Sequence, residues 1–118
     1  MALLDFGGST ISVKASGPAT TDQVLDVGLY FASLTLQLSL VGLTVSGGSP
    51  SFVLELETSM DPKAETWFSL GAFAAMSALP AQEKKNFTDL LRYVRWNVTT
   101  FTDVTSAHFM LSGVARNP

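Results

Sequence analysis

The sequence contains no cysteine and a single histidine, His108, among its 118 residues. The absence of cysteine excludes disulfide bonds, thiolate catalysis and cysteine-ligated zinc. One histidine without any cysteine also leaves too few nitrogen and sulfur ligands for the usual zinc sites. We therefore predict no metal and no cofactor, and we expect His108, which lies in an alternating segment, to be a surface or interface residue.

Charged residues are scarce, at 14% of the chain, whereas ordinary soluble domains carry about 25%. The net charge is −3, the pI is near 4.8, and the lysines and arginines are scattered along the sequence. Binding to nucleic acid through phosphate neutralisation requires a basic stripe, so we predict no nucleic-acid partner. With so little charge, the surface must be rich in serine and threonine or partly buried against a partner.

A run without charged residues extends over residues 27–45, close to the length of roughly 20 residues that spans a membrane as a helix. Within this run, however, polar residues alternate strictly with the leucines from Leu34 to Leu40. An alternation with period two is typical of a half-buried strand and not of a lipid-facing helix. The N-terminus also lacks the basic region that opens a signal peptide. We therefore expect a soluble protein with no membrane partner.

Several other segments show strand-like alternation. Phe52–Glu57 has one apolar and one partly acidic face and ends at an Asp-Pro turn. The strand predicted at residues 32–40 continues through residues 41–45, and Gly42 within this continuation indicates a bulge. Further strands are predicted at residues 3–6, 10–14, 24–31, 67–73, 90–99 and 106–115. About seven to nine short antiparallel strands with Gly, Pro, Ser and Asp turns predict an all-β fold, a single β-sandwich or jelly-roll-like domain.

Two regions lack a clear period. Residues 74–86 pass from small apolar to polar side chains, and we predict a long loop crossing between the sheets, with one helical turn at Pro80 as the alternative. Residues 15–22 are rich in turn-forming residues. A chain of this length fits one domain, with a β-sandwich at residues 23–118. Residues 1–22 form either an edge strand of this domain or an N-terminal arm that packs on a neighbour.

No catalytic constellation is visible in the sequence. There is no Gly-x-Ser-x-Gly elbow, and a single histidine would be the only imidazole base. The acidic residues Glu55, Glu57, Asp61 and Glu65 are close in sequence and suggest a calcium or glycan site. Turn formation is the alternative, because the Asp61 side chain can bond backbone amides two residues on. We predict that the chain is not an enzyme.

The segment Arg92–Val98 predicts a strand with two different faces. If Trp96 and its neighbours at i ± 2 face the core, Arg95 points outward beside Tyr93. An exposed Arg and Tyr pair is typical of an interface anchor. The alternative is a cross-strand pair between Arg95 and a carboxylate, worth under about 1 kcal/mol if it is exposed.

Three motifs resemble those of small structural proteins of tailed-bacteriophage virions. They are the strand and Ser-x-Asp turn at residues 54–61, the Trp strand at 65–70 and the Tyr-Val-Arg strand at 92–99. The resemblance covers residues 51–115 and implies a β-sandwich that decorates or cements a capsid, bound to its outside and bridging capsomers. The pattern also resembles galactose-binding-like and other jelly-roll carbohydrate modules. We predict Trp67 and Trp96 on core faces, however, which leaves no exposed aromatic platform.

We therefore predict a non-enzymatic phage virion structural protein, a capsid decoration or cement protein that stabilises the major capsid shell. Its partner would be the major capsid protein or another virion protein, in a homo-oligomer or a symmetric array on the capsid surface, after assembly in the host cytoplasm. The alternatives are a tail, baseplate or head–tail connector component, and a carbohydrate-binding module whose ligand is a glycan. The predicted interface residues are Leu3, Leu4, Phe6, Tyr93 and Arg95.

Overall fold

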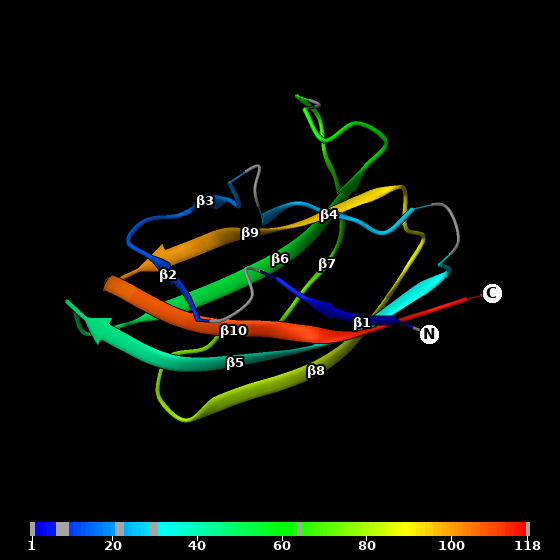
Figure 1. Cartoon of the computed structure of the whole chain (residues 1–118). Coiled ribbons are helices and arrows are strands. Elements are labelled where there is room, and N and C mark those ends of the chain that lie inside the picture. The colour runs from blue at the N-terminus through cyan, green and yellow to red at the C-terminus, as the bar shows by residue number, and fades with distance from the viewer. Residues whose placement is uncertain (1, 7–9, 21–22, 29–30, 64, 118) are drawn as a thin grey trace.

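The computed structural model describes residues 2–6, 10–20, 23–28, 31–63 and 65–117, together with the side chains of these residues from Phe6 onward. The described residues form two antiparallel β-sheets packed face to face, and no α-helix (Figure 1). Sheet A contains β1 (Ala2–Asp5), β2 (Ile11–Val13), β5 (Ser33–Val45), β8 (Ala81–Thr88) and β10 (Val104–Arg116). Sheet B contains β3 (Gly17–Pro18), β4 (Leu25–Asp26), β6 (Ser51–Ser59), β7 (Phe68–Ala72) and β9 (Tyr93–Thr102). The predicted all-β sandwich is confirmed.

The strand order is that of a jelly roll. In sheet A the order is β1 and β2, then β10, β5 and β8, and in sheet B it is β3 and β4, then β9, β6 and β7. If β1–β2 and β3–β4 are each counted as one interrupted strand, eight strands result, within the predicted seven to nine. Every connection between these eight strands except the β6–β7 hairpin then passes from one sheet to the other. Two Greek keys of this kind define the jelly-roll topology.

The hydrophobic core lies between the sheets and follows from the alternation in the strands. In β5 the leucines from Leu34 to Leu40 are buried, while the residues between them are more exposed. β9 contributes Trp96 together with Val94 and Val98, which lie two residues before and after it, as predicted. The Phe109 ring of β10 packs edge-on against Trp96, with ring centroids 5.4 Å apart. Because each fully buried Leu or Phe stabilises the fold by about 1.5–3 kcal/mol, this alternation supplies much of the driving force for folding.

β5 occupies most of the uncharged run at residues 27–45. Among the described residues, no helix is long and apolar enough to cross a membrane. The predicted bulge is present, because the pairing of β5 with β10 shifts where Gly42 lies opposite His108 and Leu40 lies opposite Phe109. A Cβ atom on Gly42 would lie 2.8 Å from the His108 ring, so a larger residue at this position would have to displace that ring.

The described part of the N-terminal segment belongs to sheet A. β1 pairs antiparallel with the C-terminal end of β10, and β2 pairs with residues 107–109 of the same strand. Phe6 and Ile11, at the end of β1 and the start of β2, are buried in the core. The segment therefore packs on its own domain, which is one of the two predicted arrangements. The domain boundary at residue 22 stays a prediction.

β8 lies within the segment that we predict to be a loop or a helical turn, so that prediction is wrong for residues 81–86. The strand escapes detection because Glu83 and Lys85 share the inner face with Phe87 and remove the apolar alternation. The Lys85 ammonium donates a hydrogen bond to the Ala72 carbonyl oxygen at 2.5 Å, and the Glu83 carboxylate accepts one from the Ala74 amide at 2.7 Å. These inward-facing charges tie β8 to the segment around β7, and they discourage pairing with another chain at this edge.

Candidate functional site

The outer face of sheet B carries a polar cluster that consists of Glu55, Glu57, Trp67, Arg95 and Asn97. Across the β6–β9 pair, Arg95 Nε donates a hydrogen bond to Glu57 Oε1 at 2.8 Å. Asn97 Nδ2 donates a second one to Glu57 Oε2 at 3.2 Å. Glu57 is only 8% exposed although it lies on the outer face. Because both carboxylate oxygens are paired, the cost of burying this charge is largely offset.

Trp67 belongs to this cluster and does not lie on a core face, so our prediction for Trp67 is wrong. The guanidinium carbon of Arg95 lies 4.3 Å from the centre of the Trp67 ring. The error arises because β7 begins only at Phe68 and its pairing with β6 shifts by one residue between Leu56 and Glu57. The contact between the cation and the ring face strengthens the ion pair by excluding water from one side of it.

Glu55 lies two residues before Glu57 on the same face of β6. Burial raises the pKa of the Glu55 carboxyl above its ordinary value, and the negative charge of Glu57 raises it further, against a hydrogen bond with Ser69 that lowers it. The polar cluster therefore combines a neutralised ion pair with a carboxyl group that holds its proton to higher pH than a free glutamate does.

Tyr93 lies two residues before Arg95, on the same outer face of sheet B. The guanidinium of Arg92 stacks over the Tyr93 ring, 5.2 Å from its centre. Arg92 also donates two hydrogen bonds to the Asp26 carboxylate, from Nε at 3.3 Å and from Nη2 at 3.1 Å. These bonds lower the pKa of Asp26 and raise the pKa of Arg92. The exposed pair adds little stability, but it holds a cation over the Tyr93 ring.

The five predicted interface residues have different positions in the structure. Tyr93 and Arg95 lie together on the outer face of sheet B, and Arg95 makes the cross-strand carboxylate pair that we gave as the alternative. Phe6 is 0% exposed and belongs to the core, so it has no surface to offer a partner in this conformation. Leu3 and Leu4 lie in β1, and their side chains are outside the described residues. The interface assignment itself stays a prediction.

The loop between β6 and β7, which carries Asp61 and Glu65, projects away from both sheets (Figure 1). Asp61 Oδ1 accepts a hydrogen bond from the Lys63 amide at 2.9 Å. This is the turn geometry that we considered as the alternative to an ion site. In the described part of the chain, no group of three or more acidic or histidine side chains is arranged to hold a metal ion. A glycan site on this loop stays a prediction.

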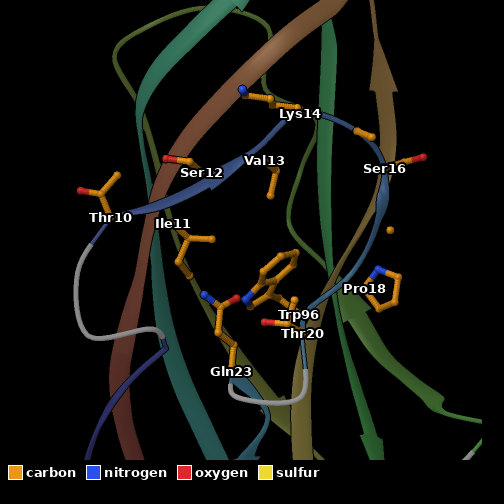
Figure 2. A pocket seen from close by; sticks show the side chains of 12 residues that line it. Thr10, Ile11, Ser12, Val13, Lys14, Ser16, Pro18, Thr20, Gln23 and Trp96 are labelled. Carbon is orange, nitrogen blue, oxygen red and sulfur yellow. The ribbon is translucent and has the colours of Figure 1, made fainter.

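A pocket of about 440 Å³ opens where the chain passes from β2 in sheet A to β3 in sheet B (Figure 2). Of the described residues that line it, Lys14 alone is charged. The hydroxyl group of Ser12 in the lining lies 2.6 Å from His108 Nδ1, which keeps His108 half-buried near the surface. The remaining polar lining is made of hydroxyl and amide side chains, namely Thr10, Ser16, Thr20 and Gln23.

Trp96 reaches the same pocket from β9 (Figure 2). The residue is only 4% exposed, and its Nε1 has no hydrogen-bond partner among the described residues. Most buried N–H groups are paired, and leaving one unpaired costs about 1–3 kcal/mol. The strand pattern predicts that Trp96 is buried, but nothing in the sequence indicates the pocket, because the turn that forms its rim has no periodicity.

The chain matches no protein-family model, and comparison with curated proteins yields no match. Three features of the chain bear on its function: the jelly-roll topology, the polar cluster beside Tyr93, and the pocket at Trp96.

Proposed function

We propose that this chain is a non-enzymatic structural protein of a tailed-phage virion, a decoration protein that binds the outside of the capsid shell and stabilises it. The observation that carries the proposal is a jelly-roll strand order in a chain with only 14% charged residues. Jelly rolls serve as virion proteins and as sugar-binding domains. The motif resemblance at residues 54–61, 65–70 and 92–99 favours the virion role over the second one.

The composition of the outer faces supports burial against a partner. On the outer face of sheet B, Tyr93 and Asn97 are uncharged, and the charges of Glu57 and Arg95 are paired with each other. Uncharged side chains lose less solvation energy than charged ones when an interface forms. A chain with this surface therefore forms extensive contacts at low cost, and many copies on a shell would act together.

The contact surface that we propose is the outer face of sheet B around Tyr93 and Arg95. Tyr and Arg are the residue types that most often dominate binding energy at interfaces. Both side chains are held in place before binding, Arg95 by Glu57 and Trp67 and Tyr93 by Arg92. Holding side chains in their bound conformation reduces the entropy lost on association.

Contact through this face agrees better with the structure than strand addition does. One edge of sheet A is β8, where inward-facing Glu83 and Lys85 disfavour pairing with another chain, and the other is formed by the short strands β1 and β2. The opposite side of β10 is already paired with β1 and β2. We therefore propose that the side chains of sheet B, and not an exchanged N-terminal arm, contact the shell.

Sedimentation velocity of the protein with empty expanded capsids of a candidate phage tests this proposal. The protein should co-sediment with the capsids and saturate at a fixed ratio to the major capsid protein. Tyr93→Ser should weaken binding at least tenfold, whereas Met110→Ser on the outer face of sheet A should leave binding unchanged. A free monomer that ignores capsids would contradict the decoration role and favour a tail, baseplate or connector component, which isolated tails in the same assay would detect.

A further inference from the structure

We propose that the pocket between β2 and β3 binds a saccharide unit, with Trp96 Nε1 as a hydrogen-bond donor to one of its oxygen atoms. This inference goes beyond the proposed virion function and does not depend on it. The pocket uses neither Tyr93 nor Arg95, because its lining comes from residues 10–18, Thr20, Gln23 and Trp96. A decoration protein with such a site would add sugar binding to shell binding.

The indole N–H of Trp96 is a buried hydrogen-bond donor at this pocket. Trp96 is 4% exposed, lines the pocket, and has no partner for Nε1 among the described residues. An indole N–H can only donate a hydrogen bond, so the group that satisfies it must bring an acceptor atom. A ligand oxygen in the pocket would pair with this donor and remove the penalty of leaving it unpaired.

Apart from Lys14 and the Trp96 indole, the polar side chains of the lining carry hydroxyl or amide groups, and they lie beside apolar residues such as Ile11 and Val13. These groups both donate and accept hydrogen bonds, as do the hydroxyl groups of a sugar ring. A nucleotide or another strongly anionic ligand would need more than the single cation Lys14. An extended peptide would need a longer open strand edge than those of β2 and β3, which have three and two residues. A neutral, hydroxyl-rich ligand fits the lining best.

The size of the pocket and the access to Trp96 Nε1 limit which ligands can bind. The pocket volume of about 440 Å³ falls at the lower end of the roughly 300–1,000 Å³ of ligand pockets, which suits a small ligand such as one or two sugar rings. Trp96 Nε1 itself is buried, so a ligand oxygen reaches it only after a neighbour moves. Gln23, whose side chain points toward the indole in Figure 2, is half-exposed. Side chains of this kind change rotamer within nanoseconds.

The test is an NMR titration of the full-length, ¹⁵N-labelled protein, because its two tryptophans give two indole N–H signals. The probes are the methyl glycosides of glucose, galactose, mannose and N-acetylglucosamine, with sodium acetate as the anionic probe. At least one glycoside should shift the Trp96 indole signal in a saturable way, with a Kd of about 1 mM or tighter. The Trp67 signal on the outer face of sheet B should stay in place, and Trp67→Phe serves to assign the two signals.

Two variants separate binding from folding. Trp96→Phe keeps a buried ring and removes a donor that has no partner among the described residues, so the chain should fold and lose at least tenfold in glycoside affinity. This affinity is measured from the backbone amide signals of the lining, because the variant has no Trp96 indole signal. If Trp96→Phe unfolds, Ser16→Ala removes one exposed hydroxyl group of the lining and should weaken the same titration by about threefold or more. The proposal is overturned if no glycoside moves the Trp96 signal at about 10 mM. A shift with acetate alone, a shift of Trp67 alone, or unchanged affinity in the folded variants would overturn it as well.

Discussion

At the scale of single residues, the ion pair between Glu57 and Arg95 is the contact that most clearly joins stability to the proposed interface. The sequence places Arg95 on the outer face and suggests a carboxylate partner, but it does not identify Glu57. That choice depends on the register between β6 and β9, which shifts by one residue between Val53 and Leu54. A one-residue shift exchanges the two faces of a strand, and no local pattern in the sequence shows where it occurs.

Arg95→Ala should lower the free energy of unfolding by about 2–3 kcal/mol, because it leaves the Glu57 carboxylate buried with Asn97 as its remaining partner. The double variant Glu57→Gln/Arg95→Gln removes both charges and should lose less than Arg95→Ala alone. Urea denaturation at neutral pH measures both values. A change of less than about 0.5 kcal/mol for Arg95→Ala would show that the pair behaves like an ordinary exposed ion pair.

Glu55 should make stability depend on pH in a defined direction. Its folded-state pKa is raised above the ordinary value of 4.5, so the folded chain binds more protons than the unfolded chain between these two pKa values. In that interval the free energy of unfolding falls as the pH rises. Urea denaturation between about pH 4 and pH 7 should show this slope, and Glu55→Gln should reduce it. An equal slope in Glu55→Gln would assign the effect to another group.

At the scale of elements, the central strand pair β5–β10 sets the geometry of sheet A. Both strands are predicted from their alternation, including the bulge at Gly42, because their inner faces are continuously apolar. β8 is missed because its inner face carries charges whose partners, the backbone groups of Ala72 and Ala74, become neighbours only after the sheets pack. The sequence therefore predicts elements that bury apolar side chains and misses an element held by tertiary hydrogen bonds.

Gly113→Ala should be among the most damaging single substitutions in the chain. A Cβ atom at this position would overlap the Thr35 carbonyl oxygen of β5, so the two strands would have to move apart. We expect a loss of about 3 kcal/mol or more in the free energy of unfolding, measured by thermal or urea denaturation. Gly48→Ala is the matched control, because nothing lies within 4 Å of its added Cβ. Equal stability of the two variants would mean that β5 and β10 are not this close.

Deletion of residues 1–16 should prevent stable folding, because it removes Phe6 and Ile11 from the core and exposes the edge of β10. The loss of these two side chains alone costs several kcal/mol, a large part of the roughly 5–15 kcal/mol that stabilises a domain. Circular dichroism and thermal denaturation measure the effect, with a chain lacking its last two residues as control. A truncated chain that unfolds cooperatively at the unchanged midpoint would instead show that this segment is a dispensable arm.

At the scale of the whole molecule, the fold class could be predicted because nearly every strand with an apolar face leaves a period-two pattern in the sequence. The jelly-roll strand order and the pocket could not, since both depend on long-range pairings, such as β3 and β4 with β9. Of the candidate site, the sequence predicts the outward position of Arg95 beside Tyr93. It does not predict that Trp67 stacks on Arg95, because that contact joins the start of β7 to β9 across β6.

The most direct test of the decoration role is electron cryomicroscopy of empty phage capsids incubated with the purified protein. We expect added density of jelly-roll shape at fixed lattice positions on the outside of the shell. The outer face of sheet B, with Tyr93 and Arg95, should be turned toward the major capsid protein. Shells without added density would contradict the decoration role. Binding through the outer face of sheet A would contradict the proposed contact surface.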